Sequence, residues 1–219
     1  MQPTEKTTYH HGDLRRALLN VSVDMIDQKG IDALNLRELA ILAGVSSGAP
    51  YHHFANRAQL LGAIAQEGFE LLVATMSEQR DLAPSSSSAR LEALGRAYVL
   101  FATSHRGHFR VMFRVDAAAS ALPQASLVAD KAFQMLSDAI KECQQAGAAP
   151  SGDPQLLVLH AWATVHGLAT LFVDGGLTKI PIAPESLVPM ITHLTSQLFA
   201  ALAKTTAQAD NYRCDLDPP

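Results

Sequence analysis

The chain has 219 residues, 48% of them hydrophobic, which is enough to build the core of one large domain or two small ones. Ala, Leu, Gln and Ser are abundant and β-branched and aromatic residues are modest in number, so the composition favours helices over sheets. The net charge of −4 excludes a chain coated in positive charge, and two cysteines without close spacing, Cys143 and Cys214, indicate neither a disulfide scaffold nor a zinc site.

The acidic excess lies outside the N-terminal part of the chain. Residues 1–60 carry six Lys/Arg and six Asp/Glu, whereas the remainder carries eleven and fifteen. This balance does not exclude nucleic-acid binding by the N-terminal part, because a few placed cations and backbone amides can make the phosphate contacts. The first ten residues are polar and lack an apolar segment, so we expect no secretory signal.

Apolar periodicity and turn signals predict four helices in the first 80 residues. The first covers residues 13–29 and stops at Gly30. The second opens at Asn35 with Glu38 three residues on, as in a capping box, and is followed by Gly44, which suits a tight turn. The third is short, residues 47–54, and the fourth runs from 57 to about 79.

Five further helices are predicted after a flexible connection at residues 81–88, which contains Pro84 and four consecutive serines. The fifth ends before Gly107, the sixth covers 108–113, the seventh stops at Gly147, the eighth covers 154–173 and the ninth lies after Pro184. Residues 117–124 are interpreted as a loop, and Asp153 followed by Pro154 is typical of a helix start. The expected fold class is therefore all-α with about nine helices, divided into a head (1–58), a larger helical domain (59–207) and a polar, disordered tail (208–219).

The second and third predicted helices form a helix-turn-helix between Asn35 and Phe54. Apolar side chains account for its inside: Leu36, Leu39, Ala40, Val45, Tyr51 and Phe54. The outside of the third helix keeps only small or hydrogen-bonding groups, namely Ser47, Gly48, Ala49 and His52. A recognition helix needs such a face, because carboxylates repel phosphates and bulky groups hold the helix out of the groove. Arg37 and Arg57 lie near helix N-termini on either side, where phosphates bind readily.

The run from Gly44 to Leu60, GVSSGAPYHHFANRAQL, resembles the signature of the TetR family, in which a Tyr-x-His-Phe core is followed by Lys or Arg and then Leu. The resemblance covers roughly residues 10–65. It implies a transcriptional regulator in which Tyr51 and Arg57 contact phosphates and Ser47, Gly48, Ala49 and His52 face bases or the nearby backbone. His53 and Phe54 would be mainly structural. Arg57 stands where lysine is frequent, which keeps the charge but changes the phosphate geometry.

Residues 9–15 resemble the N-terminal arm of a subset of the same family. Two interpretations stay open. The arm reaches a minor groove or the DNA backbone, or it is a frayed terminus with a helix cap at Asp13.

The eighth predicted helix contains Trp162-Ala163-Thr164-Val165-His166-Gly167, which resembles the Trp/His-Gly (WHG) class of TetR C-terminal domains. Residues 156–173 carry no charge, and acids flank them at Asp153 and Asp174. A membrane span normally has cationic flanks on one side, so a helix buried in protein is the better interpretation. One side would face its own core and the other a second protein surface, with Gly167 permitting close approach.

The resemblance implies a homodimer through a four-helix interface of the eighth and ninth helices. The residues selected for it are Leu157, Ala161, Leu168, Ile191, Leu194 and Leu198. The candidate effector pocket is lined by Leu72, Met76, Tyr98, Phe101, Phe109, Met112, Phe113, Phe133, Trp162 and His166. Such an apolar cavity suits a small lipophilic or aromatic effector, although residues of each of these kinds more often belong to an ordinary core. His166 is either the polar anchor of a ligand or bonded to a neighbouring helix.

We expect the protein to be a transcriptional regulator that works in the cytoplasm, at the nucleoid. In the simplest case it is a repressor that leaves a pseudo-palindromic operator when an effector binds. We expect no cofactor, no metal and no membrane partner. The alternatives are an activator and a DNA-binding module controlled by a partner protein. A metal-dependent enzyme is least favoured. His160 and His166 lie roughly 120° apart around a helix, so they cannot bind one metal ion together. His105 and His108 have no third metal ligand nearby in the sequence. No nucleophile elbow or phosphate loop occurs in the sequence.

Overall fold

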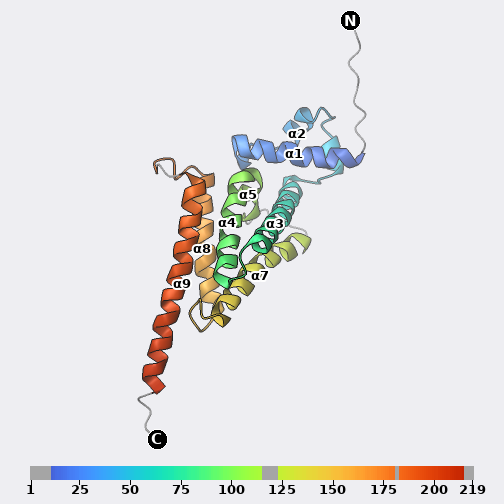
Figure 1. Cartoon of the computed structure of the whole chain (residues 1–219). Helices are drawn as coiled ribbons and strands as arrows, with labels where there is room; N and C mark the ends of the chain where they lie inside the picture. Colours follow the sequence, from blue (N-terminus) through green and yellow to red (C-terminus); the bar gives the residue numbers. More distant parts are fainter. Residues whose placement is uncertain (1–10, 115–122, 181–182, 215–219) are drawn as a thin grey trace. The chain divides into compact units, whose positions relative to one another are not determined.

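The computed structural model describes residues 11–114, 123–180 and 183–214 (Figure 1). Those residues form eight α-helices and two 3-10 helices and contain no strand, which confirms the all-α class. The N-terminal arm up to residue 10, most of the expected loop at 117–124 and the last five residues lie outside the described residues.

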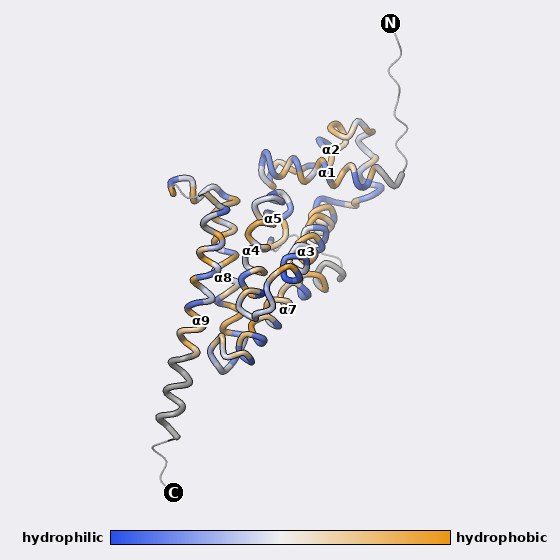
Figure 2. The backbone as a smooth tube through the Cα atoms, in the orientation of Figure 1, coloured by the Kyte–Doolittle hydropathy of each residue, from blue (hydrophilic) through white to orange (hydrophobic). Residues whose placement is uncertain are grey.

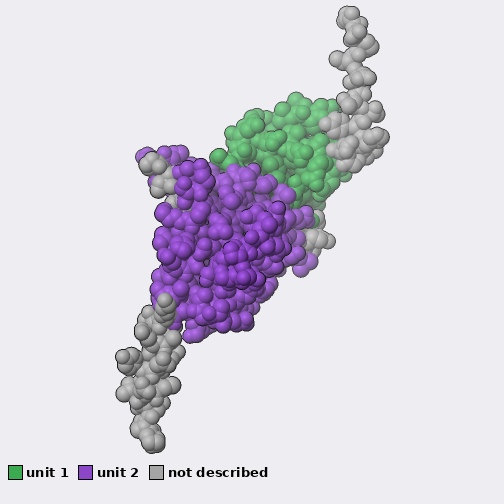
Figure 3. Space-filling view, viewed as in Figure 1, with its two compact units in different colours: residues 1–68, 106–126 green, residues 69–105, 127–219 purple. Residues whose placement is uncertain are grey.

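Two compact units divide the chain (Figure 3). The head unit comprises residues 1–68 and 106–126, and the body unit comprises residues 69–105 and 127–219. This division differs from the expected boundary at residue 58. The reason is that Leu60, Leu61 and Ile64 are fully buried in the core of the head, as is Val111 from much later in the chain.

The head unit contains α1 (His11–Lys29), η1 (Ile31–Ala33), α2 (Leu36–Leu42), η2 (Ala49–His52), the first turns of α3 (Arg57–Leu82) and α5 (Arg106–Met112). The Asn35 side chain caps α2 by accepting hydrogen bonds from the backbone N–H groups of Arg37 (2.9 Å) and Glu38 (3.0 Å). These bonds confirm the Asn35 cap. The Glu38 side chain of the expected capping box instead pairs with Lys29 of α1 at 2.9 Å.

The expected third helix at residues 47–54 is instead the four-residue 3-10 helix η2. Its turns close between residues three apart, as in the bonds from Tyr51 N–H to the Gly48 carbonyl (3.1 Å) and from His53 N–H to the Pro50 carbonyl (3.0 Å). Pro50 has no N–H to donate, so an α-helix that began well before this residue would lack one of its backbone hydrogen bonds.

Helix α5 is fastened to α1 although 76 residues separate the end of one from the start of the other. A Cβ on Gly107 would lie 2.5 Å from the Val23 carbonyl oxygen, so the two backbones are in contact. Nearby, the guanidinium of Arg110 donates to the backbone carbonyls of Ile26 (3.2 Å) and Asp27 (2.9 Å) near the C-terminal end of α1. These contacts explain why α5 belongs to the head unit.

The body unit contains the rest of α3, then α4 (Ser87–Ser104), α7 (Pro123–Gln145) from Leu127 onward, α8 (Pro154–Val173) and α9 (Pro184–Cys214). Helix α4 packs against both α8 and α9 (Figure 1). The cap at Asp153 is confirmed, because its side chain accepts from Gln155 N–H at 2.9 Å.

Two expected irregular segments of the body are shorter than predicted. Helix α3 continues to Leu82 and Ser86 already caps α4 through Ala89 N–H (3.2 Å), so the connection is a tight turn. Helix α9 continues into the residues assigned to the tail, as far as Cys214, with Pro189 tolerated near its start. Polar composition alone therefore misplaced the end of the last helix.

Candidate nucleic-acid interface and effector site

The turn between α2 and η2 depends on Gly44. Its φ of +67° is a left-handed conformation that side chains rarely adopt. The N–H of Val45 then reaches back to the Ala40 carbonyl at 2.9 Å and closes the C-terminus of α2. The chain reverses within two residues and presents η2 beside α2.

Most of the residues predicted to bind DNA lie on the outward face of this turn. Ser47, Gly48 and His52 are exposed, and Ala49 is half-buried against the head core. Tyr51 is 48% exposed, so its side chain lies on this outer face. Its ring was also predicted to face the inside of the motif, which is wrong. Pro50 and Phe54 are buried and hold the face from beneath, and no acidic side chain occurs among residues 47–56.

Arg37 and Arg57 differ in surroundings although both were predicted phosphate ligands. Arg37 is exposed in the first turn of α2. The half-buried Arg57 donates from Nη2 to the Ile31 carbonyl (2.8 Å) and from Nε to the Leu34 carbonyl (3.2 Å). The guanidinium thus has a structural role that the sequence did not reveal, because its partners lie more than 20 residues earlier in the chain.

Two further contacts fix the signature residues in place. The guanidinium of Arg15 lies over the Phe54 ring, 5.3 Å from its centroid, so α1 covers the end of the motif. Asn56 caps α3 by accepting from Gln59 N–H, and the Gln59 side chain accepts from Ala55 N–H, both at 2.9 Å. This reciprocal cap orients the first turn of α3 next to the exposed face.

Four residues of the predicted effector pocket form an aromatic cluster inside the body unit, namely Tyr98, Phe133, Trp162 and His166. The Tyr98 hydroxyl lies 2.8 Å from Nδ1 of His166. The Trp162 ring contacts His166 (centroids 5.6 Å apart) and meets Phe133 edge to face at 6.2 Å. Tyr98 is buried and Phe133 is 49% exposed, so the cluster runs from the interior to the surface.

The other predicted pocket residues are divided between the two units. Leu72, Met76 and Phe101 are buried in the body unit. Phe109, Met112 and Phe113 belong to the head unit, where Phe109 and Phe113 meet edge to face at 5.6 Å.

The polar members of the aromatic cluster are neutral near pH 7. Burial raises the pKa of Tyr98, and a hydrogen bond with Trp162 opposes this rise. Burial lowers the pKa of His166. The cluster therefore offers hydrogen bonds without a formal charge.

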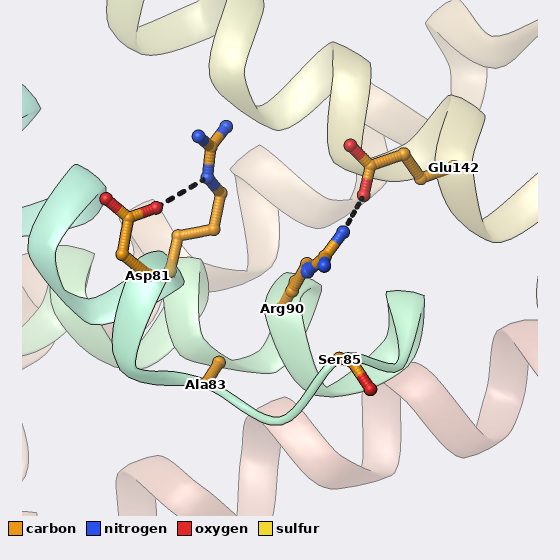
Figure 4. Close-up of a pocket in the computed structure, with 6 residues that line it drawn as sticks. Asp81, Ala83, Ser85, Arg90 and Glu142 are labelled. Atoms are coloured by element: carbon orange, nitrogen blue, oxygen red, sulfur yellow. Dashed lines mark hydrogen bonds and ion pairs between the residues drawn. The ribbon is translucent and has the colours of Figure 1, made fainter.

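A separate surface pocket of about 370 Å³ lies where α3 and α4 meet α7 (Figure 4). Its polar lining includes Arg80, Asp81, Arg90 and Glu142. Arg90 pairs with Glu142 at 3.4 Å and Arg80 with Asp81 at 3.7 Å, so each cation faces an acid. This pocket does not resemble the apolar effector pocket expected from the sequence.

Helices α8 and α9 are rich in apolar residues (Figure 2), and several of these residues are exposed. The exposed apolar or small residues include Leu156, Leu159, Ala163, Gly167 and Leu171 on α8 and Met190, Leu194, Leu198 and Leu202 on α9. Polar residues such as His160, His193 and Gln197 are exposed among them. Of the predicted dimer residues, Leu194 and Leu198 are among these exposed residues, and Leu157 and Ile191 are half-buried. Ala161 and Leu168 are instead buried against the chain's own core, because they lie on the opposite side of α8.

Helix α8 is long and apolar enough to cross a membrane, and 22% of its most apolar window is buried within the chain. Among the described residues, no group of three His, Cys, Asp or Glu side chains is placed to hold a metal ion.

Models of two protein families match the chain. One, described as bacterial regulatory proteins of the tetR family, matches residues 18–64 and so spans the helix-turn-helix. The other, described as a tetracyclin repressor-like C-terminal domain, matches residues 91–207, more than half of the chain. The narrower Trp/His-Gly class stays a prediction.

Curated relatives include the HTH-type transcriptional repressor KstR2. The Mycobacterium tuberculosis (strain H37Rv) protein is 26% identical over 119 residues, 53% of this chain and 58% of the relative. The Mycolicibacterium smegmatis protein is 30% identical over 117 residues, 52% and 55% of the two chains. The matched segment thus spans somewhat more than half the length of these relatives.

Solved structures extend the likeness over nearly the whole chain. A protein of unknown function from Rhodococcus sp. RHA1 is 36% identical, with a TM-score of 0.74 over 90% of this chain and 98% of the other. AibR, solved with isovaleryl coenzyme A and operator DNA, is 20% identical, with a TM-score of 0.65 over 85% and 98%, and shares the fold. Together with the two family models, these matches show that the chain belongs to the TetR family of DNA-binding transcriptional regulators.

Proposed function

We propose that this TetR family member is a repressor that binds a pseudo-palindromic operator as a dimer and leaves it when a small lipophilic or aromatic effector binds. The observation that carries the proposal is the exposed, acid-free face of η2. Ser47, Gly48 and His52 are small enough or polar enough to approach base edges in a major groove. The exposed Arg37 and Tyr51 lie beside this face, where phosphates would run. The half-buried Arg57 would add positive charge near this face.

The apolar surface of α8 and α9 supports a homodimer. Soluble monomers rarely expose contiguous apolar patches of this kind. The two helices contact each other, as in the ring contact of His160 with Phe199 at 5.8 Å, and we infer that their exposed apolar residues form one surface. A symmetry copy would complete a four-helix interface and present two heads to successive major grooves, about 34–36 Å apart or a multiple of that.

The aromatic cluster supports an effector site. It combines large apolar rings with a few polar atoms and reaches the surface at Phe133, the composition expected of a small-molecule pocket. AibR carries isovaleryl coenzyme A and a further structural neighbour is named a ketosteroid regulator, so ligands with lipophilic parts occur on this fold. An effector that binds more tightly to a dimer whose heads are wrongly spaced for DNA would lower the affinity of the dimer for its operator.

The alternative functions differ from this proposal in the direction of regulation or in the signal that controls it. The curated KstR2 relatives are named repressors, which favours repression over activation. The half-open aromatic cluster favours a small ligand over control by a partner protein. A regulator of this kind works in the cytoplasm, at the nucleoid that holds its operator.

Fluorescence anisotropy of a labelled mixed-sequence duplex, titrated with purified protein at several salt concentrations, tests the proposal. We expect the logarithm of the affinity to fall linearly with the logarithm of the salt concentration, because phosphate contacts release counterions. Arg37→Ala should make this slope shallower by about one. An affinity that does not change with salt would contradict DNA binding, and a monomeric mass in solution would contradict the dimer.

A further inference from the structure

Two neighbouring arginines near the start of α1 have different partners. Arg16 pairs through Nη1 with the Glu67 carboxylate of α3 at 2.6 Å. Arg15 instead lies over the ring of Phe54, 5.3 Å from its centroid. Successive residues of a helix point about 100° apart, so the two cations leave α1 in different directions. One cation is paired with an acid, and the other lies at the end of the helix-turn-helix.

The Phe54 ring places the Arg15 guanidinium beside the exposed face of η2. Phe54 follows His52, the last residue of η2, by two positions and is only 2% exposed. Because Arg15 is exposed and covers this ring, its guanidinium lies on the outer side of Phe54, next to the residues proposed to enter the groove. Residues 47–56 contain no acid, and Glu38, the one acid of α2, pairs with Lys29.

The ring contact leaves the hydrogen-bonding groups of Arg15 available. A cation is attracted to a ring face through its charge, and a guanidinium has five N–H donors that this contact does not use. Within the described parts of the chain, no acid pairs with Arg15 and no acceptor bonds to its guanidinium. The ring also restricts a long side chain, so less conformational entropy remains to be lost on binding. Arg15 is thus held in place and able to bind an anion.

The geometry of the major groove indicates which anion lies at this position. The groove is about 12 Å wide, and a phosphodiester backbone runs along each side of it. A face that enters the groove through Ser47, Gly48 and His52 therefore has a phosphate backbone at its edge, within reach of an arginine side chain. The planar guanidinium matches two phosphate oxygens at once.

We infer that Arg15 binds a DNA phosphate at the edge of the major groove and so adds a contact from α1 to those proposed for Arg37 and Tyr51. The inference deepens the proposed DNA-binding function and rests on it. A phosphate carries no sequence information, so Arg15 raises the affinity for every duplex and selects no bases. Phe54 is a positioning residue, because it holds the guanidinium at this edge.

Neutral variants of Arg15 test the inference in salt titrations of a labelled mixed-sequence duplex, followed by fluorescence anisotropy. We expect Arg15→Gln to bind about threefold to tenfold more weakly at low salt. The slope of the logarithm of affinity against the logarithm of salt concentration should become shallower by about one for each bound head. Arg15→Met, which can still cover Phe54, should have the same slope as Arg15→Gln, whereas Arg15→Lys should retain the wild-type slope.

Arg16→Gln is the matched control. It removes the same charge from the neighbouring residue, whose guanidinium is paired with Glu67, so it should leave the slope unchanged. Circular dichroism of each variant checks that the head is folded. A wild-type slope in either neutral variant of Arg15, an equal change in Arg16→Gln, or a shallower slope in Arg15→Lys would overturn the inference.

A second measurement locates the phosphate itself. Duplexes recovered by selection from a random pool can carry a neutral methylphosphonate at one backbone position at a time. We expect one substitution in each half-site to weaken the wild type severalfold, about as much as the loss of Arg15 does, and to leave Arg15→Gln unaffected. Equal sensitivity of the two proteins at every position would overturn the inference.

Failure of the proposed function gives a different result. A wild type whose DNA affinity does not change with salt would contradict DNA binding and, with it, the role of Arg15. A wild type with salt-dependent affinity and neutral Arg15 variants of the same slope would contradict the role of Arg15 alone.

Discussion

Arg57 donates a hydrogen bond of 2.8 Å from Nη2 to the backbone carbonyl of Ile31. This bond, with a second one to the Leu34 carbonyl at 3.2 Å, ties the first residue of α3 to the segment between α1 and α2. A residue that resembles a phosphate ligand in sequence is thus also part of the scaffold of the head.

Arg57→Ala should therefore reduce stability as well as DNA affinity. Both carbonyls would lose a charged donor, so we expect the free energy of unfolding to fall by about 1–3 kcal/mol in urea titrations. Arg57→Lys should recover only part of this loss, because an ammonium cannot reproduce the planar fork. Arg37→Ala is the matched control, since that exposed side chain should change stability by less than about 0.5 kcal/mol. Equal stability of the two alanine variants would contradict the structural role of Arg57.

His52→Ala and Tyr51→Phe should separate base reading from backbone contact. Loss of the His52 ring should change the preferred base at particular positions of the half-site and leave the salt dependence unchanged. Loss of the Tyr51 hydroxyl should weaken binding to all duplexes alike, because a phosphate contact carries no sequence information. Affinities measured on a panel of single-base operator variants would distinguish the two patterns.

Local patterns predicted much of this structure, and long-range contacts account for what was missed. The Asn35 and Asp153 caps, the Gly44 turn and the outward face of η2 follow from residues close in sequence. The placement of α5 in the head and the partners of Arg57 do not, because they join residues far apart in the chain. The orientation of α8 was missed for another reason. A helix apolar nearly all round has no polar stripe to show which side is exposed.

Gly107→Ala should be more damaging than Gly68→Ala. The new methyl at residue 107 would meet the Val23 carbonyl oxygen at 2.5 Å, where backbone would have to move. At residue 68 the nearest atoms belong to the flexible Met112 side chain, at 2.7 and 2.8 Å. We expect Gly107→Ala to cost about 1–3 kcal/mol of unfolding free energy and Gly68→Ala clearly less. The reverse order in thermal or urea unfolding would show that α5 is not fixed to α1 through this contact.

Gly167→Leu should affect folding and association in opposite directions. Nothing lies within 4 Å of the position where its Cβ would stand, and leucine is a better helix former than glycine by roughly 0.5–1 kcal/mol. The same side chain would hold a second copy away from α8. Sedimentation should therefore show a weaker dimer, while circular dichroism shows an intact fold. Leu82→Glu, an exposed site on α3 outside this surface, should leave the dimer unchanged.

Acidification should weaken the aromatic cluster through His166. Its pKa is lowered in the folded chain, so below about 6.5 the unfolded chain binds more protons and stability declines as the pH falls toward the folded pKa. Protonation also places a hydrogen on Nδ1, which lies 2.8 Å from the Tyr98 hydroxyl. His166→Gln should remove this part of the pH dependence between pH 7 and 5. Parallel stability curves for the two proteins would contradict the half-buried, neutral state of His166.

Selection of bound DNA from a random duplex pool tests the central claim most directly. The account predicts two inverted half-sites, spaced by a whole number of helical turns, whose preferred bases change in His52→Ala and persist in Leu82→Glu. Recovery of no enriched sequence, or of a single half-site without symmetry, would contradict a dimeric regulator that reads DNA through the face of η2.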